Sequence, residues 1–240
     1  MEPRRKPVSF PSMATAEFFP PGHRPYTDRE EVLHALSHGL AIPLGVAALV
    51  VLVIRAEGAV AVSTAAIYGA SVIAVYLAST LYHATFRSRW QAFFRTVDHA
   101  AIYLKIAGTY TPIALLALPP TTGIVLLTVV WTLAVTGIAV KVWKRNLPAE
   151  AKAERLSLIF YLGMGWAGVF AVWPLWQSLG PAGFGWLLAG GACFTVGAWI
   201  YSMHERMWSH LWWHVFTMAG SACHFVLIWR VLEPMAAVSG

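Results

Sequence analysis

Seven long apolar runs are the feature that most limits how this chain can fold. A helix that crosses a bilayer needs roughly 20 mainly apolar residues, and seven stretches meet that need: residues 32–54, 59–83, 98–118, 122–143, 156–177, 183–202 and 211–232. Short breaks separate them, including Pro119-Pro120 and Gly180-Pro181. The apolar-polar alternation of membrane β-strands is absent. The sequence therefore predicts an all-α integral membrane protein with seven transmembrane helices.

Composition indicates the same class of protein. Of the 240 residues, 58% are hydrophobic and only 12% are charged, whereas soluble domains carry roughly 25% charged residues. We expect a flexible cytoplasmic tail at 1–30, a transmembrane domain at 31–233 and a short extracytoplasmic tail at 234–240. The net charge of +6 would suggest nucleic acid in a soluble basic domain. Here the basic residues lie in loops, so nucleic acid is not an expected partner.

The basic residues also predict the orientation of the chain. Most of the 17 Lys and Arg residues fall in the N-terminal tail and in the second, fourth and sixth connections. Only Arg55 and Arg230 fall on the opposite side, and Lys105 lies within a span. Because Lys and Arg are enriched in cytoplasmic loops, the N-terminus is predicted to lie in the cytoplasm.

Polar side chains occupy the ends of three of the predicted spans. His83 closes the second span, Asp98 opens the third, and His210 and His214 open the seventh. Even-numbered helices end on the cytoplasmic side and odd-numbered helices begin there. These residues are therefore expected to share one depth, near the cytoplasmic face, although more than a hundred positions separate them in the sequence.

The chemistry of these side chains indicates a metal site. His210 and His214 are four residues apart and therefore lie on one helix face, and Ser79 and His83 have the same spacing. Neutral imidazoles bind zinc, copper, iron and nickel, and three protein ligands plus water is the arrangement of catalytic zinc. Asp98 would bind the metal or hold its water. Ser79 would orient His83 or a substrate carbonyl.

Other histidines are weaker candidates. His34 and His38 form another pair four residues apart at the start of the first span, where they would support the ligands or form a competing site. His99 points about 100° away from Asp98 on an ideal helix and is expected to have a packing role.

Two ionisable residues lie deeper in the predicted spans. His224 is roughly 15 Å beyond His214 along the helix axis, too far to bind the same ion. Lys105 is two turns past Asp98 and would either extend toward the interface or pair with a buried acid.

Several motifs resemble the haemolysin III proteins of bacteria, which belong with the progestin and adipoQ receptors (PAQR), including the adiponectin receptors. The similarity runs from about residue 30 to 232. The matching pieces are Ala78-Ser79-Thr80-Leu81-Tyr82-His83, Asp98-His99-Ala100-Ala101-Ile102-Tyr103, Ile106-Ala107-Gly108-Thr109-Tyr110-Thr111-Pro112, Ser209-His210 through His214, and Ala219-Gly220-Ser221-Ala222-Cys223-His224-Phe225.

The resemblance implies seven helices with a cytoplasmic N-terminus, in the inner membrane of a bacterium. It implies that zinc is bound by His83, His210 and His214, that Asp98 holds a water and that Ser79 is the family's serine. A more remote resemblance to alkaline ceramidases implies hydrolysis of a lipid amide or ester, with membrane lipid as the partner.

Two other functions remain open alternatives to a zinc-dependent lipid hydrolase. One is a receptor or regulator of membrane homeostasis in which zinc only holds helices together. The other is a pore-forming haemolysin, as the family name implies. The sequence argues against a pore, because it shows no secretion signal and its seven apolar spans are typical of a resident membrane protein.

Overall fold

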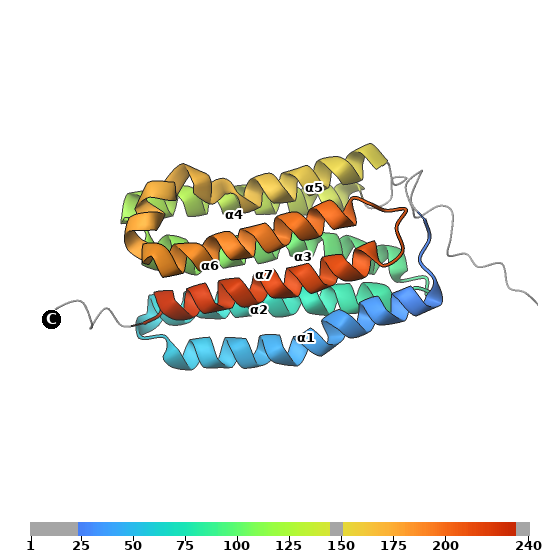
Figure 1. Ribbon diagram of the computed structural model, residues 1–240, viewed down its shortest axis with the longest axis horizontal. Helices are drawn as coiled ribbons and strands as arrows, with labels where there is room; N and C mark the ends of the chain where they lie inside the picture. Colours follow the sequence, from blue (N-terminus) through green and yellow to red (C-terminus); the bar gives the residue numbers. More distant parts are fainter. Residues whose placement is uncertain (1–23, 145–150, 234–240) are drawn as a thin grey trace, which may run out of the picture.

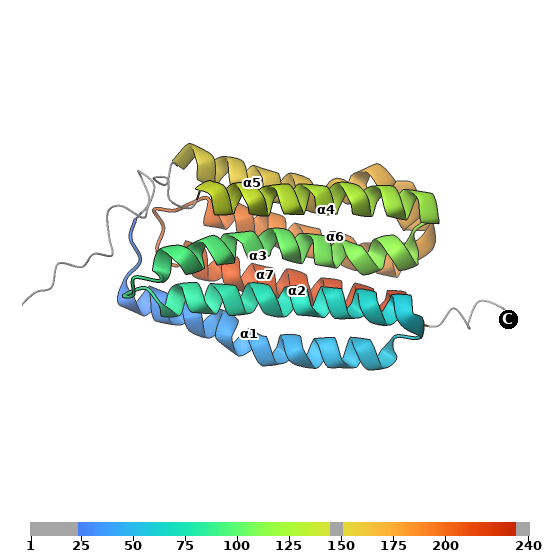
Figure 2. The same cartoon turned by 180° about the vertical axis from the view of Figure 1, so that it is seen from behind.

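The computed structural model describes residues 24–144 and 151–233, and every regular element in these two ranges is helical. Residues 1–23 of the expected N-terminal tail and all of the expected C-terminal tail lie outside these ranges. The α-helices are α1 (Asp28–Arg55), α2 (Gly58–Ala84), α3 (Gln91–Pro112), α4 (Pro120–Trp143), α5 (Ala151–Gly165), α6 (Val172–Tyr201) and α7 (Ser209–Val231). A π-helical turn (η1, Ile113–Ala117) extends α3, and a 3-10 turn (η3, Ala167–Ala171) joins α5 to α6. Figures 1 and 2 show the helices lying side by side in one bundle.

Six segments of the described chain are long and apolar enough to cross a membrane. Five of them coincide with single predicted runs, whereas the sixth, Glu154–Tyr201, contains both the fifth and the sixth run in 48 residues. At 1.5 Å per residue a straight helix of this length would be about 72 Å long, more than twice the hydrocarbon thickness of a bilayer.

The long segment turns back on itself. Gly180 has φ 61° and ψ 178°, a conformation that is not helical and that glycine adopts readily. Pro181 follows it and cannot donate a backbone hydrogen bond. Figure 1 shows α5 and most of α6 running alongside one another on either side of the turn. The break therefore lies where the Gly180-Pro181 pair predicted it.

Helix α1 starts earlier than its apolar run because a capping box fixes its first turn. The Thr27 hydroxyl accepts a hydrogen bond from the backbone N–H of Glu30 at 3.3 Å, and the Glu30 carboxylate accepts one from the Thr27 N–H at 2.9 Å. This reciprocal arrangement satisfies two backbone donors that would otherwise have no partner. It also fixes the helical turn that carries Glu31 and leads into His34.

The bundle is apolar on the outside and carries polar groups inside. Leu40 and Leu44 are each 70% exposed and Phe170 is 92% exposed, whereas the buried side chains include several histidines, two glutamates, Asp98 and Lys105. This distribution is the reverse of that in a soluble protein, and polar side chains in membrane helices usually face the bundle interior. The chain is therefore a multi-pass membrane protein.

Candidate metal centre

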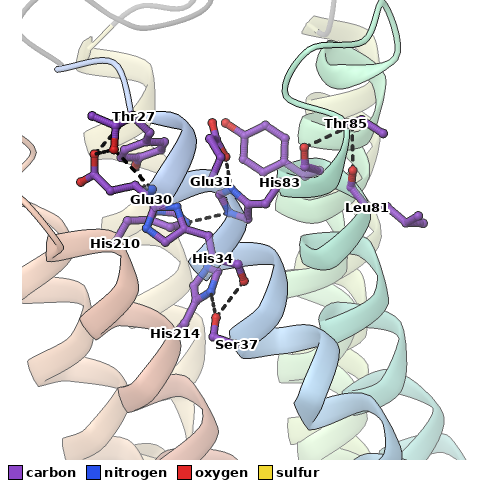
Figure 3. Close-up of polar contacts among 12 residues, drawn as sticks. Thr27, Glu30, Glu31, His34, Ser37, Leu81, His83, Thr85, His210 and His214 are labelled. Atoms are coloured by element: carbon purple, nitrogen blue, oxygen red, sulfur yellow. Dashed lines mark hydrogen bonds and ion pairs between the residues drawn. The ribbon is translucent and has the colours of Figure 1, made fainter.

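Four imidazoles from three helices meet inside one end of the bundle. His34 comes from α1, His83 from α2, and His210 and His214 from the start of α7. The ring centre of His210 lies 4.7 Å from those of His34 and His214 and 4.9 Å from that of His83. All four side chains are buried. Figure 3 shows them converging between the three helices. The expected convergence of α2 and α7 therefore occurs, and α1 joins it.

Glu31 orients the imidazole of His83. Its carboxylate lies 2.7 Å from Nδ1 of His83, and both side chains are buried. In its ionised form, which a cation bound at the cluster would favour, the carboxylate can only accept; Nδ1 of His83 then donates and Nε2 keeps its lone pair. A carboxylate behind a histidine is the usual arrangement around metal-binding imidazoles. Sequence reasoning missed Glu31, although an acid at the buried start of an apolar run is a signal that could have drawn attention to it.

The two histidines of α7 are oriented by hydroxyl groups. The Tyr26 hydroxyl lies 3.1 Å from Nδ1 of His210, and Ser37 Oγ lies 2.8 Å from Nδ1 of His214. The Ser37 hydroxyl also donates to the carbonyl oxygen of His34 at 2.8 Å. Because that hydroxyl has a single hydrogen, Nδ1 of His214 donates to Ser37 Oγ, which leaves the lone pair on Nε2. Sequence reasoning did not identify Tyr26 or Ser37.

The free nitrogens of the cluster are spaced as the ligands of one ion would be. Nε2 of His83 and Nε2 of His210 are 3.0 Å apart. Two nitrogens bound to tetrahedral zinc at about 2.0–2.1 Å would be separated by about 3.3–3.4 Å. At this distance one ring can donate a hydrogen bond to the other, with the donor set by the tautomers of the two imidazoles. A cation placed between them would replace that hydrogen and bind the lone pairs of both nitrogens. The donor set therefore fits a metal ion.

His34 has the donor atoms most in need of a partner. Ligand nitrogens of His34, His83 and His210 all lie within 4.8 Å of one another, close enough to hold one metal ion. Within the described residues, neither ring nitrogen of His34 has a hydrogen-bond partner, although both atoms are buried. Such an imidazole is costly unless something binds it. The group with metal-like spacing thus contains His83 and His210 of the predicted set, with His34 in the place of His214. The assignment to His83, His210 and His214 stays a prediction.

Three further histidines of the described ranges, His38, His99 and His224, lie outside the group of four. His38 stacks on His214, with ring centres 3.8 Å apart and an interplanar angle of 8°, and its Nε2 contacts Thr217 Oγ1 at 3.3 Å. His99 lines a separate small pocket beside Asp98, and His224 lies further along α7.

Asp98 and Ser79 line the same cavity as the α7 histidines. The cavity has a volume of about 190 Å³ and extends from His210 and His214 along the bundle interior to His224. Asp98 is 8% exposed and Ser79 is 2% exposed. Most other lining residues are apolar side chains of α3, α5 and α6. The structure therefore brings the two candidate catalytic residues to the wall of one apolar cavity, while their roles stay predictions.

Tyr26 covers the end of the histidine cluster. Its ring centre lies 4.9 Å from that of His34 and 5.2 Å from that of His210. Burial raises the pKa of the Tyr26 hydroxyl well above its usual range, so the phenol stays neutral. An ion pair between Arg24 and Glu30 fastens the segment that carries it.

Strain in the backbone occurs next to the metal-centre residues of α7. Trp208, directly before the helix, has φ 68°, the one left-handed conformation of a non-glycine residue in the described ranges. Its N–H contacts the Glu30 carboxylate at 3.4 Å. Such conformations cost free energy and are often found at functional sites. Here the strained turn sets the position at which α7 begins, and therefore the position of His210.

Comparison with known proteins identifies the family. A family model described as Haemolysin-III related matches residues 26–225. The chain belongs to this family.

Two bacterial relatives support the haemolysin-III assignment over most of the chain. Hemolysin-3 of Bacillus cereus is 37% identical over 214 residues, which cover 87% of this chain and 94% of that protein. The Hemolysin-3 homolog of Bacillus subtilis (strain 168) is 39% identical over 216 residues, covering 87% and 98%. The human Monocyte to macrophage differentiation factor is 28% identical over 179 residues, or 70% of each chain. These similarities confirm the resemblance to haemolysin III proteins and the link to the PAQR superfamily.

Proposed function

We propose that this haemolysin-III-related protein binds zinc at the histidine cluster and hydrolyses an amide or ester bond of a membrane lipid. The observation that carries the proposal is the cluster itself, with three histidines held through Nδ1, two of which, His210 and His214, line an apolar cavity. Asp98 and Ser79 line that cavity. An orienting partner for each imidazole, an acid and a hydroxyl are the parts that a metal-assisted hydrolase needs.

We place the protein in a bacterial inner membrane with seven spans and a cytoplasmic N-terminus. Seven spans are favoured because Glu154–Tyr201 is too long for one crossing and is broken at Gly180. The orientation is favoured by the Lys and Arg residues of the second, fourth and sixth connections. In this placement the histidine cluster lies near the cytoplasmic face, at the depth of lipid headgroups.

The residues of the site would divide the chemistry among them. His83, His210 and His214 would hold zinc, with His34 as the alternative or additional ligand. Bound zinc would supply a Lewis acid and lower the pKa of water toward about 7. Asp98 would position that water and carry its proton, and Ser79 would donate a hydrogen bond to the lipid carbonyl. The apolar wall of the cavity would hold the acyl chain and exclude bulk water.

Lipid turnover by an Asp98→Asn variant tests this function. Asn has the size of Asp but cannot take a proton, so hydrolysis of ceramide or lysophospholipid should fall at least 100-fold, the usual range for losing a general base. Zinc content should be unchanged. Asp28→Asn is the matched control, because Asp28 is 62% exposed and pairs with Arg87 at the surface. Equal turnover by wild type and Asp98→Asn would refute the hydrolase.

A regulator with structural zinc is the second candidate. Imidazoles from α1, α2 and α7 lie close together in the cluster. An ion bound there would link three helices that are far apart in the sequence. In this case chelation lowers the melting temperature and no lipid is turned over. The name Hemolysin-3 of the Bacillus relatives suggests the third candidate, a pore, which leakage of dye from liposomes carrying the purified protein would support.

A further inference from the structure

Lys105 places an amine, which an anion beside it would keep protonated, inside the cavity and away from the histidine cluster. It lies on α3 two turns after Asp98, about 10 Å further along the helix axis. Its side chain is 7% exposed and lines the cavity. Nζ lies 3.9 Å from the centre of the Phe194 ring on α6. The residue therefore turns into the bundle instead of extending to the membrane surface.

No ion pair joins Lys105 to a carboxylate within the described residues. Three of the acids are engaged elsewhere, Glu30 with Arg24, Glu31 with His83 and Glu154 with Arg95, and Asp98 lies two helical turns back along α3. The aromatic face of Phe194 offsets only part of the cost of taking an ammonium group out of water. A buried cation without an anion beside it is a place where a bound anion would be strongly favoured.

His224 adds a second polar group to the same part of the cavity. Both of its ring nitrogens are buried and neither makes a hydrogen bond of normal geometry among the described residues, with the backbone of Leu187 as the neighbouring polar group. Its ring centre lies 5.5 Å from that of Phe194, so Lys105 and His224 approach the same aromatic ring. A Cβ added at Gly190 would lie 2.2 Å from Nε2 of His224, which means that the imidazole rests directly against the backbone of α6.

We propose that Lys105 and His224 bind the headgroup of a monoanionic single-chain amphiphile, a long-chain carboxylate, inside this cavity. One ammonium matches one carboxylate, and the imidazole of His224 can donate the second hydrogen bond to its other oxygen. The apolar residues that line the cavity, among them Leu175, Leu187 and Phe184, would contact the chain. The volume of about 190 Å³ is below the roughly 300 Å³ at which pockets for drug-sized ligands begin, which favours one chain over two.

This subsite deepens the proposed function, because it rests on the cavity being a lipid site, but it does not need a metal. A carboxylate is also the acyl product of amide or ester hydrolysis. The anion would therefore bind about two helical turns from the reacting centre, and Lys105 would retain the released acid or a free acid from the membrane. Its binding can be measured whether or not the histidines hold an ion.

Binding of dodecanoate and of dodecanol to the protein in lipid nanodiscs tests the subsite. The two probes share one chain and differ in charge. Wild type should bind dodecanoate at least tenfold more tightly than dodecanol. Lys105→Met should lose at least tenfold in dodecanoate affinity and keep its dodecanol affinity, which also shows that the variant is folded. Lys105→Arg should restore most of the preference, and His224→Phe should lose part of it.

The His210→Ala/His214→Ala variant separates this subsite from the metal centre. It should bind dodecanoate as wild type does, even with its zinc lost. If it binds dodecanoate normally while wild type shows no lipid turnover, the proposed hydrolase fails and the subsite stands. Equal dodecanoate affinity in wild type and Lys105→Met, or no binding of dodecanoate by wild type, would overturn the subsite.

Discussion

At the scale of single residues, the account depends on groups that orient histidines. Glu31→Gln keeps the size of the side chain but removes the carboxyl group that lies 2.7 Å from Nδ1 of His83. Zinc affinity should fall about 10–100-fold, the usual effect of removing such a partner. Competition with a chelating dye measures the change. Glu57→Gln at the start of α2, at the opposite end of α1, is the control and should bind zinc as wild type does. An unchanged affinity in Glu31→Gln would show that His83 needs no carboxylate.

The choice between His34 and His214 as the third ligand is also a question of single residues. The motif assignment predicts that His34→Ala retains one zinc per chain, whereas His214→Ala loses most of its metal. The ring centres of His34 and His214 are 5.5 Å apart, so each variant serves as the control for the other. Zinc retained by His214→Ala and lost by His34→Ala would move the ligand set to His34, His83 and His210, the group whose nitrogens already lie within 4.8 Å.

At the scale of elements, the first turn of α1 carries both the cap and part of the site. Thr27→Ala removes the hydroxyl that accepts from the Glu30 N–H and should destabilise the helix start by about 1 kcal/mol. Amide hydrogen exchange at residues 28–31 should speed up about fivefold. Thr128→Ala, on the exposed side of α4, should leave these amides unaffected. Equal exchange in both variants would mean that the capping box does not hold this turn.

The sequence predicted where the helices lie along the chain better than it predicted which side chains each helix turns toward the site. Apolar runs located the helices, and Gly180-Pro181 located the turn, because bilayer thickness limits span length. Helices α1 and α3 begin earlier than their runs, at Asp28 and Gln91, since polar residues continue them past the apolar stretch. The shared depth of His83 and His210 followed from topology. The place of His34 did not, because the rotation of α1 about its own axis is set by packing that no periodicity reveals.

At the scale of the whole molecule, the proposed seven crossings would put the two termini on opposite faces of the membrane. A single cysteine introduced within residues 1–23 should react with a membrane-impermeant maleimide only after the membrane is permeabilised. A single cysteine within 234–240 should react in intact spheroplasts. Both variants are made in a protein that carries Cys193→Ala and Cys223→Ala. This protein without an introduced cysteine is the control and should not be labelled. Labelling of both termini from one side would contradict seven spans and leave the six segments of the described chain as six crossings.

The central claim is that the histidine cluster holds a metal ion, and the zinc content of detergent-purified protein tests it most directly. Elemental mass spectrometry should find close to one zinc per chain in wild type and almost none in a folded His210→Ala/His214→Ala variant. His99→Ala, outside the cluster, should keep its zinc and serves as the matched control. Wild-type protein that stays free of zinc and of other transition metals, even after loading, would contradict the claim and leave the four imidazoles as a polar packing network.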